Sequence, residues 1–336
     1  MKKILLTGAA GSIGYETLKQ LITTNHEITV LDLPTKNNKN KLEPLKNQIT
    51  IIYGNINNEE TIKHAIKNKD IIIHLAAIIP PLADKNPELT RQINYFGTLN
   101  IIKQIKSTNK NCFLIYSSSV SVYGDRINNP WIKVSDPLKA SYSDYYAYTK
   151  IETEKLIKSS HINYTIFRLT GIMGHPKTDP LMFHMPLNTK IEIATTKDTA
   201  KAFVNAIEKT KELNHNTYNL GGGKQCRTTY QDFLTNMFKI YGLNIKFMKE
   251  RAFAEKNFHC GYFLDSDKLN KILNFQTDTL KSYYDRIKKE TKKPFHNISV
   301  ILSRPIMYFL NKSSEPLQAR KKSDKNLIYR FFKKDK

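Results

Sequence analysis

The chain has 336 residues, 40% of them hydrophobic, which is enough for one large domain or two small ones with a sizeable core. It has no apolar run near the roughly 20 residues that span a bilayer. Its three cysteines, Cys112, Cys226 and Cys260, show no metal-ligand spacing, and their odd number argues against a disulfide framework. The short apolar stretch at the N-terminus runs straight into a glycine motif, which favours a first strand over a signal peptide and predicts a cytoplasmic protein. The net charge of +23 suits anionic partners, but most of it is Lys spread thinly among Asn and Ile, and no nucleic-acid-binding module accompanies it.

The first half of the chain alternates apolar strands with helical patterns. Strands are predicted at residues 3–7, 27–33, 49–53, 70–75, 112–117 and 163–169, and helices at residues 12–24, 59–67, 87–108 and 143–159. Such alternation predicts an α/β fold, a Rossmann-type doubly wound parallel sheet with right-handed crossovers. Beyond about residue 170 the alternation weakens, which predicts a smaller C-terminal lobe that binds the substrate.

A glycine-rich loop joins the first strand to the first helix. Residues 7–14 read TGAAGSIG, a spacing that allows a tight turn and brings backbone N–H groups and a helix N-terminus close to a pyrophosphate. Asp32 ends the second strand, where a carboxylate can accept hydrogen bonds from the adenosine ribose and would repel a 2′-phosphate. The pattern therefore predicts NAD as the cofactor, bound by Gly8, Gly11, Ser12, Ile13, Gly14 and Asp32.

A second group of residues carries the chemistry. The fifth strand runs into Ser117, Ser118 and Ser119, and Tyr146 and Lys150 follow at a spacing that puts them on one face of a helix. We expect the ammonium to lower the pKa of the tyrosine, which can then exchange a proton with a substrate hydroxyl. Ser119, Tyr146 and Lys150 are the predicted catalytic residues, because neither Tyr145 nor Tyr148 has a lysine four residues on.

These motifs together resemble the extended short-chain dehydrogenase/reductase family, in its NAD-dependent nucleotide-sugar epimerase/dehydratase group. The resemblance covers roughly residues 1–285 and includes HLAA at 74–77, NYFGT at 94–98, YSSSVSVYG at 116–124, YAYTK at 146–150 and FRLTGIMG at 167–174. It implies a nucleotide-sugar substrate, a role in polysaccharide biosynthesis, and a homodimer built from the helix after residue 87 and the helix with Tyr146. It adds to the cofactor site Asn55, Ile56, Leu75, Ala76, Ala77, Asn94, Ser117, Tyr146 and Lys150.

The resemblance also bears on the reaction. The family's 4,6-dehydratases have an Asp-Glu pair where this chain has Val120 and Ser121, and its decarboxylating members have a Glu at the second position. Epimerisation by transient oxidation of a hydroxyl carbon remains. The alternatives are a one-way reductase or dehydrogenase, similar to dihydroflavonol reductases or hydroxysteroid dehydrogenases, and a non-catalytic dinucleotide sensor. The stretch from 174 to 199 is short, and the family's diphosphate-binding Arg is missing near 258–262; Arg227 and Arg251 are out of register.

Three domains follow: an NAD-binding domain at 1–170, a small lobe at 171–287 with elements interleaved with the first, and a basic extension at 288–336. The extension has 14 Lys or Arg and four Asp or Glu around the apolar run 297–311. It is either a helix packed on the lobe with a solvated, partly disordered end, or a contact with an anionic membrane surface. We expect His74 to be a core residue and residues 219–223 (NLGGG) to be a turn in the lobe.

Overall fold

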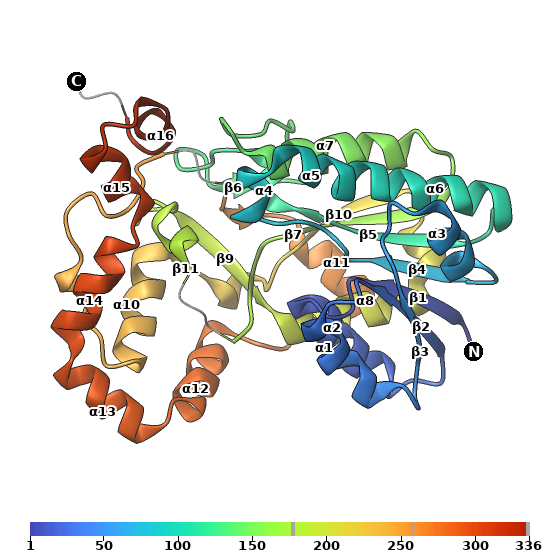
Figure 1. The fold of residues 1–336 in the computed structure, drawn as a ribbon, viewed down its shortest axis with the longest axis horizontal. Coiled ribbons are helices and arrows are strands. Elements are labelled where there is room, and N and C mark those ends of the chain that lie inside the picture. The colour runs from blue at the N-terminus through green and yellow to red at the C-terminus, as the bar shows by residue number, and fades with distance from the viewer. Residues whose placement is uncertain (176–178, 257–258, 334–336) are drawn as a thin grey trace.

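Seven parallel strands form the large sheet of the protein, in the order β10-β7-β5-β4-β1-β2-β3 (Figure 1). The computed structural model describes residues 1–175, 179–256 and 259–333. The strands are β1 (Lys3–Thr7), β2 (Glu27–Asp32), β3 (Thr50–Tyr53), β4 (Ile71–His74), β5 (Phe113–Ser119), β7 (Asn163–Leu169) and β10 (Asn216–Leu220). Central strands are buried on both faces, which explains why they read as unbroken apolar runs.

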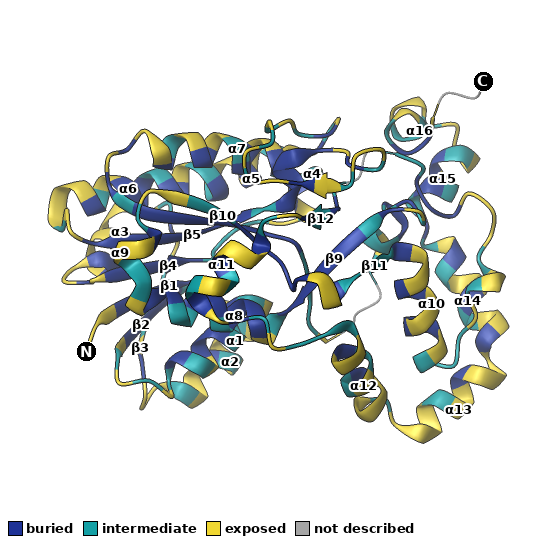
Figure 2. Cartoon of the chain, turned by 180° about the vertical axis from the view of Figure 1, so that it is seen from behind, coloured by how far each residue is buried: buried dark blue, intermediate teal, exposed yellow. Residues whose placement is uncertain are grey.

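Helices cover both faces of this sheet. One face packs on α1 (Ser12–Leu21), α8 (Thr196–Asn205) and α11 (Ser266–Leu273), and the other on α3 (Glu59–Ile66), α6 (Gly97–Thr108) and α7 (Tyr145–Lys158). Each face has its own apolar core, and Figure 2 shows the buried strands between the two helix layers. This arrangement confirms the predicted Rossmann-type fold with a C-terminal lobe.

The helix predicted at 87–108 is interrupted. It consists of α5 (Pro87–Arg91), a π-helical turn η2 (Gln92–Phe96) and α6. A π turn inserts one residue into the helix and rotates the side chains that follow it. Asn94 lies in this turn, so its side chain points to neighbours that a regular helix would not offer it.

The small lobe is built from shorter elements. Its strands are β8 (Gly171–Met173), β9 (Lys190–Thr195) and β11 (Arg227–Thr229), with the separate pair β6 (Trp131–Ile132) and β12 (Tyr262–Phe263), and its main helices are α10 (Tyr230–Ile240) and α12 (Leu280–Glu290). Elements α8, β10 and α11 come from the segment after residue 170 but pack with the large sheet, so the two parts interleave. Asn219 and Leu220 belong to β10, and the turn predicted at 219–223 is therefore confined to the three glycines.

Short helices link the main elements. They are α2 (Lys36–Leu42), η1 (Glu43–Leu45), α4 (Leu82–Lys85), η3 (Val120–Tyr123), η4 (Pro180–Phe183), η5 (Ala206–Lys209), α9 (Thr210–Leu213), η6 (Lys224–Cys226) and η7 (Ile245–Phe247). Among them α4 and η3 follow the carboxyl ends of β4 and β5, the edge of the sheet at which parallel α/β proteins bind their ligands.

Four helices make up the C-terminal extension: α13 (Lys293–Ile301), α14 (Ser303–Lys312), α15 (Glu315–Lys321) and α16 (Lys325–Phe331). Figure 1 shows them along the outer side of the lobe, with α16 returning toward α4 and the start of α7. Phe331 and Phe332 are buried against Ala254 and Ala319, so the described part of the extension is packed on the lobe to its end. Among the described residues no helix has the length and apolar character that crossing a membrane requires.

Candidate active site

The glycine loop makes a turn that other residues would not fit. Gly8 has φ of +71°, and a Cβ on it would lie 2.7 Å from the backbone nitrogen of Ala76. A Cβ on Gly14 would collide with the carbonyl oxygen of Gly8. The Gly11 N–H donates to that carbonyl oxygen at 3.1 Å, and α1 begins directly after it at Ser12. Among the described residues no side chain caps this helix, so its first N–H groups can bind an anion such as a pyrophosphate.

Asp32 stands at the end of β2 beside this loop. Its Oδ2 accepts a hydrogen bond from the Ala10 N–H at 2.8 Å, and its Oδ1 accepts from the Leu33 N–H and the Asn38 amide, each at 2.8 Å. Lys41 Nζ donates to the Ala10 carbonyl oxygen at 2.8 Å from the other side. The carboxylate is therefore held in one orientation next to the glycine turn, as a partner of ribose hydroxyls must be.

The other predicted cofactor residues lie on the neighbouring strands. Leu75, Ala76 and Ala77 follow β4, and the Ala76 N–H donates to Thr7 Oγ1 at 3.3 Å. Asn55 is exposed after β3, and its Oδ1 accepts from the Asn57 N–H at 2.9 Å. This bond leaves the Asn55 amide N–H₂ as the part of that side chain that can turn to an adenine.

Ile56, also predicted for the cofactor site, packs against the long helix. Its side chain is 7% exposed and packs against Gly97 at the start of α6, and its carbonyl oxygen accepts from the Asn100 amide at 3.1 Å. These contacts seat α6 beside the segment that follows β3. Taken with the glycine turn, the helix N-terminus and Asp32, the residues present fit a dinucleotide.

The structure brings Ser119, Tyr146 and Lys150 together. The Ser119 hydroxyl, at the end of β5, hydrogen-bonds the Tyr146 hydroxyl. Lys150 Nζ lies 5.6 Å from the centre of the Tyr146 ring and donates to the carbonyl oxygen of Ser117 at 2.7 Å. Lys150 is 2% exposed, whereas the neighbouring Tyr145 and Tyr148 are 43% and 49% exposed. The tyrosine in register with the lysine is thus the one that faces the strand-end serines.

The electrostatics of the pair differ from the expectation. Burial raises the pKa of Tyr146, and the hydrogen bond from Ser119 offsets only part of this increase. Burial also lowers the pKa of Lys150 to about 7, although the nearby Glu154 carboxylate favours its charged form. The predicted lowering of the tyrosine pKa by the ammonium is therefore wrong for the protein alone, because low-dielectric surroundings disfavour both charges.

Residues 4–221 match the model of the NAD dependent epimerase/dehydratase family. The chain belongs to this family. The match covers more than half of the chain and contains the glycine loop together with Tyr146 and Lys150. It confirms the family that the motifs indicate, an enzyme family whose cofactor is NAD.

Similar proteins include members with different reactions. A UDP-glucose 4-epimerase from Klebsiella pneumoniae is 29% identical over 143 residues, 39% of this chain and 99% of that protein. The human sterol-4-alpha-carboxylate 3-dehydrogenase, decarboxylating, is 25% identical over 200 residues, 57% of this chain and 50% of that protein. The solved UDP-Glc/GlcNAc 4-epimerase from Campylobacter jejuni has a TM-score of 0.70 at 20% identity, covering 87% of this chain and all of that one. The chain spans about half of the length of several curated relatives, from 44% to 58%.

In this epimerase/dehydratase-family chain, Asn94 connects two parts of the site. Its Oδ1 accepts from the Ile78 N–H at 2.8 Å, and its amide donates to the Ile78 carbonyl oxygen at 3.0 Å and to Thr149 Oγ1 at 3.2 Å. The π turn that aims Asn94 thus ties the segment after β4 to the helix with Tyr146.

Sequence reasoning missed Asp144, two residues before the catalytic tyrosine. Its Oδ1 caps α7 by accepting from the Ala147 N–H at 2.9 Å, and its Oδ2 lies 3.2 Å from His259 Nδ1 in the lobe. Asp is a preferred residue at the N-cap of a helix. Because a helix was predicted from residue 143, the capping role of Asp144 could have been predicted from the sequence. The contact with His259 had no such signal.

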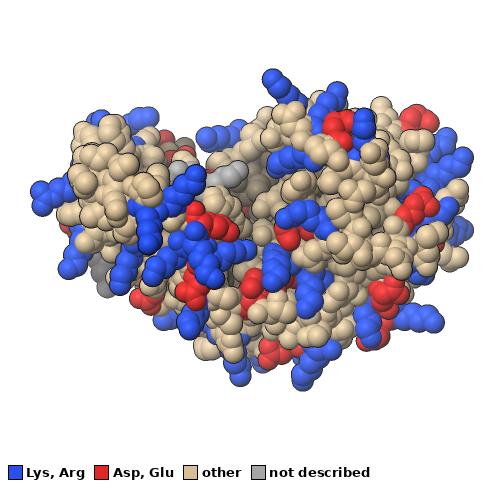
Figure 3. All heavy atoms as spheres, turned by 90° about the horizontal axis from the view of Figure 1, so that it is seen from below, with Lys and Arg blue, Asp and Glu red and all other residues tan. Residues whose placement is uncertain are grey.

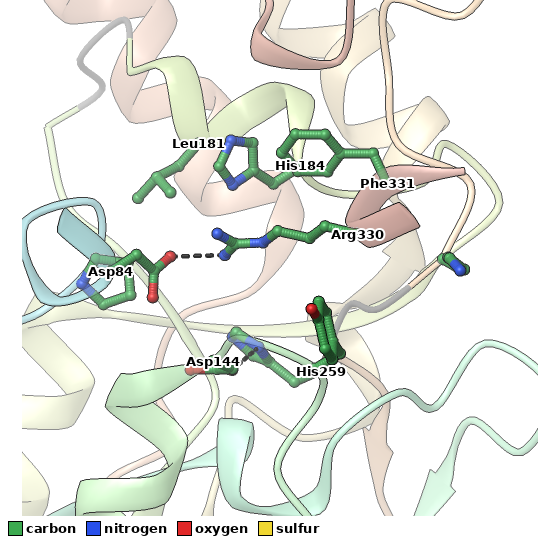
Figure 4. A pocket seen from close by; sticks show the side chains of 10 residues that line it. Asp84, Asp144, Leu181, His184, His259, Arg330 and Phe331 are labelled. Atoms are coloured by element: carbon green, nitrogen blue, oxygen red, sulfur yellow. Dashed lines mark hydrogen bonds and ion pairs between the residues drawn. The ribbon is translucent and has the colours of Figure 1, made fainter. Parts of the chain in front are cut away.

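The end of the extension also reaches this region. Arg330 Nη2, on α16, lies 2.6 Å from Asp84 Oδ2 on α4, and Figure 4 shows the guanidinium between His184 on one side and Asp144 with His259 on the other. These side chains line one pocket, which the NAD-binding part, the lobe and the extension build together. No spacing in the sequence links residues that are 246 positions apart.

Neither Arg227 nor Arg251 lies where it could replace the family's diphosphate-binding arginine at this site. Arg227 Nε pairs with Glu192 Oε2 at 2.8 Å, and its Nη2 donates to the Phe263 carbonyl oxygen at 2.6 Å. Since Glu192 is fully buried, this pair belongs to the core of the lobe. Arg251 is exposed at a different pocket. Of residues 258–262, the stretch where the family has its arginine, Phe258 lies outside the described residues.

His74 is a core residue, as predicted. It is 1% exposed, and its ring nitrogens lie 2.7 Å from Thr7 Oγ1 and 3.0 Å from Thr98 Oγ1. Burial and the Lys150 charge lower its pKa to about 3, so the ring is neutral at physiological pH. The described residues contain no cluster of His, Cys, Asp and Glu side chains that could bind a metal.

Proposed function

We propose that the chain is an NAD-dependent epimerase of a nucleotide sugar, which oxidises a hydroxyl carbon, lets the keto intermediate turn, and reduces it on the other face. The observation that carries this proposal is the meeting of Ser119, Tyr146 and Lys150 at the end of β5. Val120 and Ser121, next in η3, are buried and non-acidic, so they offer no carboxylate for eliminating water from a sugar ring. The Klebsiella epimerase relative supports the same reading.

The chain's own residues move and hold the proton. Tyr146 takes the proton of the substrate hydroxyl when the carbon is oxidised and gives it back on reduction, and Ser119 hydrogen-bonds the same oxygen. Ser119 favours the phenolate and offsets part of the effect of burial on the Tyr146 pKa, and Lys150 Nζ lies beside the ring. NAD, held by the glycine loop and Asp32, would supply the acceptor and donor of the hydride. Asn94 and Asp144 act through α7, because they hold the start of that helix in place.

A one-way dehydrogenase or reductase is the second candidate, favoured by the human sterol dehydrogenase relative. It would use the same three residues and release the oxidised or reduced product. The non-catalytic sensor is disfavoured because the complete catalytic group is present and in contact.

Proton NMR of the protein with NAD and a panel of UDP-sugars tests the proposal. A new anomeric signal that Tyr146→Phe does not produce would establish epimerisation and name the sugar. Bound NAD with no change in any sugar, but with NADH formed from an alcohol or consumed by a ketone, would establish the dehydrogenase instead.

The cofactor preference gives a direct prediction. We expect NAD to bind more tightly than NADP, because the Asp32 carboxylate, fixed beside the glycine turn, repels a 2′-phosphate. Asp32→Asn should narrow the difference between the two affinities by about tenfold, since it removes a charge worth roughly 1–2 kcal/mol at that distance. Isothermal titration with both cofactors measures it, and tighter NADP binding by the wild type would contradict it.

A homodimer in the cytoplasm is part of the proposal. Exposed apolar side chains gather on the helices expected to form the four-helix interface, among them Leu89 on α5, Phe96 at the end of η2 and Tyr148 on α7. The buried, separate thiols of Cys112, Cys226 and Cys260 agree with a reducing compartment.

The dimer can be tested by charge. Leu89→Glu/Phe96→Glu should convert the dimer to a monomer, because two carboxylates would be buried in an apolar contact. Light scattering after size exclusion measures the mass. Leu264→Glu, at an exposed leucine away from these helices, is the matched control and should leave the mass unchanged. A monomeric wild type would refute the dimer.

A further inference from the structure

The helices α13 and α14 turn their apolar side chains away from the protein. Ile301 is 80% exposed and Phe309 is 66% exposed. Seven large hydrophobic side chains on these two helices or at the residue that joins them are exposed: Phe295, Ile298, Val300, Ile301, Leu302, Tyr308 and Phe309. A helix on the surface of a water-soluble lobe normally has the reverse arrangement, with its apolar stripe against the core.

The inner faces of the same helices combine polar anchors with the apolar contacts of Met307 and Leu310. Asn311 is buried and bonds η7 and the segment after it, donating to the Phe247 carbonyl oxygen at 3.0 Å and accepting from the Lys249 N–H at 2.9 Å. His296 Nδ1 lies 2.9 Å from the Ile240 carbonyl oxygen at the end of α10, and Ser299 is buried. These bonds fix which face points outward, so the exposed apolar face is a property of the fold.

Cations surround the apolar face. Lys292, Lys293, Arg304 and Lys312 are exposed at the ends of and between the two helices. The whole extension carries 14 Lys or Arg against four Asp or Glu. Figure 3 shows the result at the lobe end of the molecule: a broad uncharged surface with Lys and Arg at its border and few carboxylates. An apolar face with a cationic border is complementary to a surface that has an apolar interior beneath a layer of negative charge.

We propose that the α13–α14 face docks on an anionic phospholipid bilayer. Its apolar side chains would enter the boundary between headgroups and acyl chains, while the surrounding lysines and arginine reach the phosphates. Neither helix can cross the membrane, so the contact is peripheral. The apolar surface continues into a groove lined by Pro180, Met182 and Phe309, which widens the area available to lipid. A nucleotide-sugar enzyme would thereby be held at a membrane while its active site stays in water.

Vesicle flotation of the full-length protein tests this docking. The vesicles are phosphatidylcholine alone and phosphatidylcholine mixed with phosphatidylglycerol. The apolar variant is Phe295→Ser/Ile298→Ser/Ile301→Ser/Phe309→Ser, and its matched control is Leu82→Ser/Leu264→Ser, at exposed leucines outside the extension. A charge variant replaces Lys292, Lys293, Arg304 and Lys312 by Gln. Circular dichroism and NAD binding show that each variant is folded, independently of any catalytic activity.

We expect the wild type and the control to float with the anionic vesicles only, and the apolar and charge variants to bind about tenfold less or weaker still. High salt should release the wild type, because screening weakens attraction to the headgroups. Equal flotation of the apolar variant and the wild type, or no flotation of either, would overturn the proposal. So would a wild type that ignores vesicles but dimerises through this face, which a mass decrease in the apolar variant would reveal.

Discussion

Replacing Tyr146 by Phe should lower kcat about a thousandfold and leave NAD binding nearly unchanged. The hydroxyl is the group that exchanges the substrate proton, and positioned acid–base groups contribute about 10²–10⁴ in rate. The ring itself packs beside Lys150 and would remain, since Phe keeps the same shape. Turnover is measured with the sugar that the NMR panel identifies, and cofactor content by release of bound NAD after denaturation.

Tyr148→Phe is the matched control for this variant. It lies two residues further on α7, carries the same hydroxyl and is 49% exposed, with no lysine four residues on. It should keep kcat within about twofold of the wild type, because a half-exposed surface hydroxyl takes no part in proton transfer. If both variants were equally slow, the loss would come from a disturbed helix, and the acid–base role of Tyr146 would be refuted.

Much of the large sheet could be predicted from the sequence because its strands are covered on both faces. Residues 3–7 and 163–169 were predicted with the bounds that β1 and β7 have, since a parallel strand between two helix layers reads as an apolar run. The glycine loop and the Tyr146–Lys150 spacing were equally readable, because both depend on local geometry.

What the sequence could not predict depends on contacts between distant segments. Asp84 meets Arg330 because the extension folds back over the lobe. Strand β10 comes from the second half of the chain but pairs with β7, the last strand of the first half. The raised pKa of Tyr146 also arises from tertiary packing, since burial outweighs the lowering effect of the hydrogen bond from Ser119. The π turn at η2 is a further example, because the residue within it, Asn94, bonds to the distant segments of Ile78 and Thr149.

Behind the catalytic helix lies a buried ion pair that joins three elements. Arg168 on β7 pairs with Glu154 on α7 through two bonds, Nε to Oε1 at 2.9 Å and Nη2 to Oε2 at 2.7 Å. Ser118, at the end of β5, donates to Glu154 Oε1 at 2.6 Å, and the Arg168 guanidinium also donates to Tyr123 Oη at 2.7 Å. Both charged side chains are at most 3% exposed. The pair therefore holds the strand end with Ser119 against the helix with Tyr146.

Arg168→Met should lower the free energy of unfolding by about 3–5 kcal/mol, because it leaves the Glu154 carboxylate buried with only weaker partners. Lys209→Met is the control: its pair with Glu212 is 2.8 Å long but half exposed, so its loss should cost about 0–1 kcal/mol. Urea unfolding at neutral pH measures both. Arg168→Met/Glu154→Leu should be more stable than Arg168→Met alone, because the second change removes the unpaired charge. A double variant less stable than Arg168→Met would mean that the arginine acts mainly through its bonds to Tyr123 and Val134.

The effect of Arg168→Met should depend on pH in a definite direction. Burial raises the pKa of Glu154, but the hydrogen bonds and charge of Arg168 lower it more, so it lies below its ordinary value of 4.5 in the wild type. The stability from this carboxylate is therefore present above about pH 4.5 and is lost as the pH falls further. In the variant, burial without the arginine raises the same pKa, so acid protonates Glu154 and relieves the penalty. The gap between the two proteins should be widest near neutral pH and should shrink in acid, whereas a gap that is constant with pH would show that the loss comes from packing and not from the charge.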